Sequence, residues 1–226
     1  MPEPKKRELF EGEGVIRFDK EVDRRNFLKY AGMVGVGSTL ALAGVACASD
    51  DDTSTRPTPR GTESPEPEGD LAILNYALTL EYLEADFYKQ GLAGNLLSGR
   101  ERSLVEPIGA HEQAHVDALT ATINDLGGTP VAEPTFQYPN GTFTNKDTFL
   151  ETASTFEELG VTAYYGQVTL IESPEILSAA ASIAGVESRH AAVIATLTGG
   201  DPFPATVEAT KTMDEVLAAA KPFIES

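Results

Sequence analysis

The sequences IGAHEQAH at residues 108–115 and IAGVESRH at residues 183–190 resemble each other position by position. Each contains a glutamate followed three residues later by a histidine, Glu112 with His115 and Glu187 with His190. Both lie in segments whose apolar side chains recur every three or four residues, the period of an amphipathic helix. Side chains at i and i+3 of a helix point the same way. Each helix therefore presents a carboxylate and an imidazole together on its apolar face.

A second pair of segments repeats in the same order. LEYL at residues 80–83, with Tyr88 beyond it, matches FEEL at residues 156–159, with Tyr164 beyond it. The separation along the chain is nearly the same as for the first pair. The chain therefore contains two copies of one helical hairpin.

Start and stop signals set the expected helix boundaries. They predict helices over about residues 70–91, 99–127, 147–172 and 173–199, with a shorter one after residue 212. Ser98 and Glu101 have the spacing of a capping box before the second helix. The hairpins are joined by a link of about 18 residues with three prolines, which is long enough to cross a bundle. We predict an all-α fold, a four-helix bundle with a long crossover and a short C-terminal fifth helix.

The other two helices also carry a carboxylate on their apolar faces. Glu81 lies on the apolar stripe of the first helix and Glu157 on that of the third. Glu158 falls on a polar line, so Glu157 is the inward residue of the pair. Glu84, one turn beyond Glu81, is expected at the margin of the site or exposed to solvent.

Four inward carboxylates are too costly to bury as bare charges, so they are either protonated or compensated by cations. Two divalent metal ions would supply four positive charges against four glutamates, and neutral imidazoles would complete the coordination. A glutamate from each of two helices plus Glu-x-x-His from the other two is the ligand set of di-metal carboxylate bundles. In that scheme Glu112 and Glu187 bridge the ions. The terminal ligand pairs are Glu81 with His115 and Glu157 with His190.

These motifs resemble the ferritin-like superfamily, and more closely the ferritin-like domain of exported and desiccation-related proteins. The resemblance spans residues 70–200. It is carried by LEYLEA at residues 80–85, by Glu157 with Gly160, Val161 and Tyr164, and by the two Glu-x-x-His motifs. It implies a centre of two iron or two manganese ions that reacts with oxygen or peroxide. Iron and manganese accept the same ligands, so the sequence does not distinguish them.

Tyr88 and Tyr164 lie on the same apolar stripes as Glu81 and Glu157. They are candidates for packing residues, for participants in redox chemistry, or for hydrogen-bond donors to the carboxylates. The last of these roles is the one we favour over a direct redox role.

The segment His111–His115 also matches H-E-x-x-H, the signature of zinc peptidases. A zinc hydrolase would use both histidines as ligands and Glu112 to activate water. That hypothesis leaves the second Glu-x-x-His and the repeat unexplained. The repeat also aligns His111 with Val186, which indicates a peripheral place for His111.

The N-terminal segment has the pattern of an export signal over residues 1–47. Arg24 and Arg25, followed by Phe-Leu-Lys and an uncharged run rich in glycine and alanine, resemble a twin-arginine signal. A transmembrane anchor is the alternative. Small residues before Cys47 resemble a lipobox, which predicts lipidation of Cys47 and a membrane-anchored lipoprotein at the cell surface or in the periplasm. Cleavage after Ala48 would instead release a secreted protein.

Residues 48–69 form an acidic tether rich in proline, serine and threonine, and residues 201–226 form a C-terminal extension. The chain has 35 acidic and 17 basic side chains, a net charge of −18, which argues against nucleic-acid binding. We expect an exported stress-response oxidoreductase acting on Fe(II), O2 or H2O2, with the twin-arginine export machinery as a partner. A homo-oligomer is compatible with the sequence. The alternative function is a non-enzymatic acidic protein that sequesters metal or protects during drying.

Overall fold

The computed structural model describes residues 69–225. Its helices are α2 (Asp70–Ala93), α3 (Gly99–Asp125), α4 (Lys146–Gln167), α5 (Pro174–Thr198) and α6 (Met213–Ala220), followed by the 3-10 turn η1 (Lys221–Phe223). The predicted export signal, Cys47 and all of the tether but Gly69 lie outside the described residues. Among residues 69–225, no helix combines the length and the apolar character that crossing a membrane requires.

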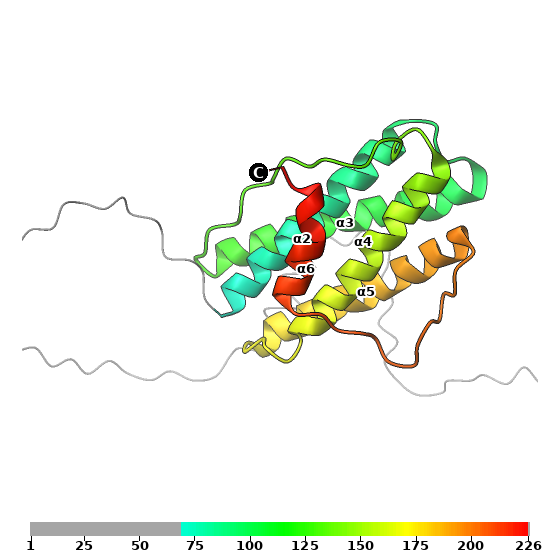
Figure 1. Cartoon of the computed structure of the whole chain (residues 1–226). Helices are drawn as coiled ribbons and strands as arrows, with labels where there is room; N and C mark the ends of the chain where they lie inside the picture. Colours follow the sequence, from blue (N-terminus) through cyan, green and yellow to red (C-terminus); the bar gives the residue numbers. More distant parts are fainter. Residues whose placement is uncertain (1–68, 226) are drawn as a thin grey trace, which may run out of the picture.

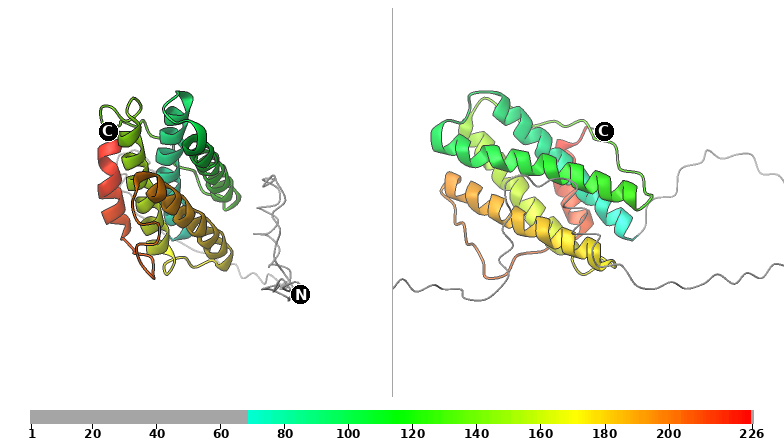
Figure 2. Two further views of the ribbon diagram at one scale, coloured as in Figure 1. Left: turned by 90° about the vertical axis from the view of Figure 1, so that its right-hand side faces the viewer. Right: turned by 180° about the vertical axis from the view of Figure 1, so that it is seen from behind.

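The first four of these helices form a bundle of two antiparallel hairpins, α2 with α3 and α4 with α5. The link over residues 126–145 runs along the length of the bundle before α4 begins (Figure 1). Viewed from behind, α3 and α5 lie in front of α2 and α4 (Figure 2). The predicted all-α bundle with a long crossover and a short C-terminal helix is therefore confirmed.

Two local details differ from the sequence expectation, and a contact between distant segments accompanies each of them. Ser98 precedes α3 but its side chain caps no backbone N–H, and the Glu101 carboxylate instead accepts from Lys146 Nζ at 2.6 Å. A complete capping box forms at α6, between Thr212 and Glu215.

Helix α4 ends at Gln167, before the predicted end near Glu172. The carboxylate of Asp70, at the start of α2, accepts hydrogen bonds from the backbone N–H groups of Glu172 and Ser173. These bonds hold the α4–α5 turn against the first turn of α2. They also leave Ile171 buried in the core.

The core consists of two apolar clusters. One is built around Phe87, Phe149 and Phe156 and is covered by α6. The other is built around Leu74, Leu119 and other aliphatic side chains nearer the start of α2. Buried glutamates and histidines on the same helices form a polar layer, and along each bundle helix buried apolar residues lie on both sides of it.

Candidate metal centre

Each bundle helix contributes one of the predicted glutamates to the polar layer. Glu81 comes from α2, Glu112 from α3, Glu157 from α4 and Glu187 from α5, and all four have no exposed surface. Glu158, which the helical period assigned to the outer face, is exposed. An apolar stripe at helical spacing therefore located the inward carboxylates correctly.

The six predicted ligands gather into two groups. Oxygen or nitrogen atoms of each group lie within 4.8 Å of one another. The first group is Glu81, Glu112, His115 and Glu187, and the second is Glu112, Glu157, Glu187 and His190. Glu112 and Glu187 belong to both groups, which is the arrangement expected of carboxylates that bridge two ions.

Both imidazoles turn Nδ1 toward the carboxylates. His115 Nδ1 lies 3.2 Å from Glu81 Oε2, 3.1 Å from Glu112 Oε2 and 3.2 Å from Glu187 Oε1. His190 Nδ1 lies 2.8 Å from Glu112 Oε1 and 3.5 Å from Glu157 Oε2. Each Nδ1 is thus surrounded by carboxylate oxygens from several helices.

Several of these converging atoms have no aligned hydrogen-bond partner, although some lie close together. Five buried side-chain atoms of the layer make no hydrogen bond, namely Glu112 Oε1, Glu157 Oε2, both oxygens of Glu187, and His190 Nδ1. Buried polar atoms in proteins are almost always hydrogen-bonded, so such a concentration of unpartnered atoms requires an explanation. Converging carboxylate oxygens and imidazole nitrogens are a donor set that could hold metal ions.

Two tyrosines support the carboxylates reciprocally. Tyr88 on α2 donates its hydroxyl to Glu157 Oε1 on α4, and Tyr164 on α4 donates its hydroxyl to Glu81 Oε1 on α2. Both rings are buried. The two residues therefore occupy the places of hydrogen-bond donors behind the candidate terminal ligands, where they fix one oxygen of each carboxylate.

Glu84 is buried, 3% exposed, so the expected exposure to solvent is wrong. It belongs to neither ligand group and lies beside them in the polar layer. A Cβ added to Gly160 on α4 would lie 3.2 Å from Glu84 Oε1 and 3.1 Å from Glu187 Oε2. The polar layer therefore holds five carboxylates, and the absence of a side chain at Gly160 makes room for the fifth.

His111 lies at the edge of the site, as the repeat predicted. Its side chain is exposed, and its Nδ1 lies 2.9 Å from His190 Nε2, the nitrogen that faces away from the carboxylates. The two rings stack with centroids 5.2 Å apart. Because His111 belongs to neither ligand group, the structure does not favour a zinc site built from His111 and His115.

The charges of the layer follow from burial and proximity. Burial, with the neighbouring carboxylates, raises the pKa of Glu84 and Glu187 well above the ordinary value. Burial also raises the pKa of Glu157, to about 7. Burial alone would raise the pKa of Glu112 too, but the adjacent imidazoles of His115 and His190 hold it at about 2.

For the two histidines, burial and the neighbouring carboxylates act on the pKa in opposite directions. Burial would lower the pKa of His190, but Glu112 and Glu157 outweigh it and raise the pKa to about 10. Burial likewise opposes the charge on His115, and Glu81 with the other close carboxylates raises its pKa as well. Without metal, the cluster therefore retains protons that a metal ion would displace on binding.

A family model of the ferritin-like domain matches residues 69–200, which include all four bundle helices and every candidate ligand. The chain belongs to the ferritin-like domain family. The matched residues cover more than half of the chain, and the family's helical bundle agrees with the fold described above. The buried glutamates and histidines of this ferritin-like domain could hold metal ions.

Among solved structures, the chain is similar to hypothetical protein MJ0754 from Methanococcus jannaschii DSM 2661. The identity is 14% and the TM-score 0.47, and the alignment covers 76% of this chain and 100% of that one. No curated protein matches the sequence.

Proposed function

We propose that the ferritin-like domain binds two iron or two manganese ions between its four helices and uses them to react with dioxygen or hydrogen peroxide. The observation that carries the proposal is the pair of ligand groups sharing Glu112 and Glu187, sealed in the bundle with unpartnered donor atoms. Four carboxylates around two sites favour hard cations in higher oxidation states.

Each ligand would have its own role in the proposed centre. Glu112 and Glu187 would hold both ions, Glu81 with His115 would complete one site, and Glu157 with His190 would complete the other. Tyr88 and Tyr164 hold one oxygen of each terminal carboxylate, which orients the other oxygen. The surrounding apolar layers exclude bulk water, so electrostatic interactions in the centre are strong.

When bound, the metal pair would supply reversible one-electron oxidation at two adjacent ions. That chemistry suits reduction of dioxygen by two electrons and disproportionation of peroxide, and both fit a role in oxidative or desiccation stress. Elemental analysis of the native protein tests the first half of the proposal. We expect two equivalents of iron or manganese per chain, and a protein purified without either metal that also fails to take them up would overturn it.

Stopped-flow measurement of O2 and H2O2 consumption tests the second half. Turnover by the iron-loaded or manganese-loaded protein supports an oxidoreductase. Metal binding without turnover would favour the non-enzymatic alternative, a metal-sequestering or protective surface protein, which the net charge of −18 also suits.

We also propose that the protein is exported by the twin-arginine machinery and anchored through a lipid on Cys47, with secretion after cleavage at Ala48 as the alternative. Export of a folded domain would allow the metals to be inserted in the cytoplasm. Metabolic labelling with a fatty acid, compared between the native protein and Cys47→Ser, tests the anchor. Label that persists in Cys47→Ser, or is absent from both proteins, contradicts it.

A further inference from the structure

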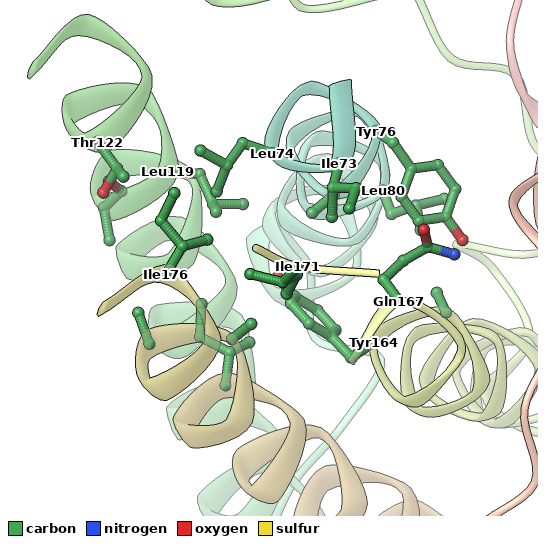
Figure 3. A pocket seen from close by; sticks show the side chains of 16 residues that line it. Ile73, Leu74, Tyr76, Leu80, Leu119, Thr122, Tyr164, Gln167, Ile171 and Ile176 are labelled. Carbon is green, nitrogen blue, oxygen red and sulfur yellow. The ribbon is translucent and has the colours of Figure 1, made fainter. Parts of the chain in front are cut away.

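The apolar layer nearer the start of α2 contains a partly open pocket of about 40 Å³. All four bundle helices line it (Figure 3). Its deeper wall includes the buried side chains of Leu80, Leu119 and Tyr164, and half-buried residues such as Ala118 and Ala180 complete the lining. Tyr164 donates its hydroxyl to Glu81, so one wall of the pocket is in direct contact with a candidate metal ligand.

The internal repeat shows why this pocket exists. When the hairpins are aligned so that Glu81 matches Glu157, the lining residues Ile73, Leu80 and Ala163 correspond to Phe149, Phe156 and Phe87. In the other apolar layer, Phe87 and Phe149 stack with ring centroids 4.7 Å apart, and Phe156 meets Phe87 edge-on. Three phenyl rings pack together where three smaller side chains line the pocket, although Leu80 and Ala163 also contact the aromatic cluster.

In the second helix of each hairpin, too, residues that line the pocket are smaller than their repeat partners. When Glu112 is aligned with Glu187, the lining residues Ala118 and Thr122 correspond to Val193 and Leu197, which pack against the aromatic cluster. Ala180 likewise corresponds to the buried Val105. At all six of these positions the residue beside the pocket is the smaller one. The pocket therefore coincides with smaller side chains at these six of its lining positions.

The size and polarity of the pocket limit which small molecules can bind in it. A volume of about 40 Å³ is several times that needed for one water and much smaller than the roughly 150 Å³ cavity that admits benzene. A buried water needs two to four polar partners. Tyr76 and Gln167, which are larger than their repeat partners Thr152 and Gly91, carry polar atoms without hydrogen bonds. In Figure 3 they lie toward one edge of the pocket. Together they offer partners for a single water at that edge, and the mostly apolar remainder of the lining offers water few partners.

We propose that this pocket is a binding site for dioxygen, from which it reaches the metal centre past Tyr164. Dioxygen is small and apolar and loses no hydrogen bonds on entering such a space. Hydrogen peroxide and hydrated Fe(II) would have to give up theirs, at a cost of several kcal/mol for each unpaired polar group. The inference rests on the proposed function and deepens it, because it names dioxygen as the oxidant that this route serves.

Xenon binding tests the pocket independently of any metal. Crystals of the purified protein pressurised with xenon should show xenon beside Ile73, Ala180 and Tyr164. The variant Ala180→Leu should lose the xenon, because the longer side chain occupies the space, and Ile73→Phe should also lose it by restoring the residue of the filled layer. Ala181→Leu is the matched control, since Ala181 is exposed on the same helix. It should retain the xenon.

Stopped-flow kinetics of the iron-loaded variants then identify the oxidant. We expect Ala180→Leu to slow oxidation by O2 while leaving oxidation by H2O2 at the rate of Ala181→Leu. Absence of xenon from the native pocket, or a chain of ordered water in its place, would overturn the inference. Equal slowing with both oxidants would overturn it as well. Bound xenon in a protein that takes up no metal would instead contradict the proposed function and leave the gas site standing.

Discussion

The Glu84 carboxylate occupies space that Gly160 leaves free on the opposite hairpin, where an added Cβ would lie 3.2 Å from Glu84 Oε1. The two residues are also repeat partners, because the alignment that pairs Glu81 with Glu157 pairs Glu84 with Gly160. The ferritin-like bundle therefore departs from its own internal symmetry at its centre. One hairpin supplies an additional carboxylate, and the other supplies the room for it.

Substituting Gly160 by alanine should damage the centre while leaving the helix intact. The new methyl group would press on Glu84 and Glu187, and we expect metal affinity to fall by about tenfold, the lower end of what disturbed outer-shell partners cost. Gly185→Ala is the control, because its Cβ would meet only Arg189 at 3.8 Å. It should keep metal affinity and gain up to about 1 kcal/mol of helix stability. Calorimetric titration with Mn(II) measures the affinity, and an unchanged Gly160→Ala affinity would contradict the packing argument.

Glu187→Gln should separate stability from metal binding. The amide mimics the protonated carboxyl that burial favours at Glu187, so the metal-free protein should keep its melting temperature. The variant also lacks a ligand common to both groups and should lose the rise in melting temperature that metal gives the native protein. Exposed Glu158→Gln should behave as the native protein in both tests. Differential scanning calorimetry with and without Mn(II) decides the matter, and a full metal-dependent rise in Glu187→Gln would exclude Glu187 as a bridging ligand.

His111→Ala tests the outer contact of His190. Loss of this partner should lower the binding affinity for the ion beside His190 by about tenfold or more. Both sites should still be saturated at high metal concentration. Gln113 is exposed on the same helix, so Gln113→Ala should leave the affinity for both metal ions unchanged. Metal content measured by elemental analysis after dialysis gives the comparison. Complete loss of metal from His111→Ala would revive the zinc hydrolase hypothesis.

The stability of the metal-free domain should fall as the pH rises from about 5 to 9. Glu157, with a pKa raised to about 7, and His190, with a pKa raised to about 10, both bind protons more tightly in the folded state. Their stabilisation is complete below the unfolded-state values and is lost as the pH rises through the folded-state values. Glu112 changes in the opposite sense, but with a pKa of about 2 its stabilisation is already complete above the ordinary glutamate value. Each kcal/mol lost should lower the melting temperature by about 2–4 °C.

Bound metal should reverse this trend, because the ligands bind it in their deprotonated forms. The difference in melting temperature between metal-loaded and metal-free protein should therefore grow with pH over the same range. A metal-free melting temperature that is flat or rises between pH 5 and 9 would contradict the assignment of retained protons.

The inward residues could be predicted because helical period is a local property. The helical period predicts that Glu157 faces inward and Glu158 outward, and the structure has Glu157 buried and Glu158 exposed. Glu84 lies three residues after Glu81, so the period also permits an inward position. Whether a carboxylate fits there depends on Gly160 across the bundle. The turn after α4 is likewise held by Asp70, a residue far away in the sequence. A contact between distant segments accompanies each feature that the sequence pattern missed.

Each ligand group draws on both hairpins, because Glu112 comes from the first and Glu187 from the second. A bound ion pair would therefore cross-link segments that are far apart in the chain, as disulfides do in many secreted proteins. The chain has a single cysteine and cannot form such a bond within itself. Unlike a disulfide, this cross-link would open to acid or a chelator without any reductant. The metal state would then govern the cohesion of the two halves as well as their chemistry.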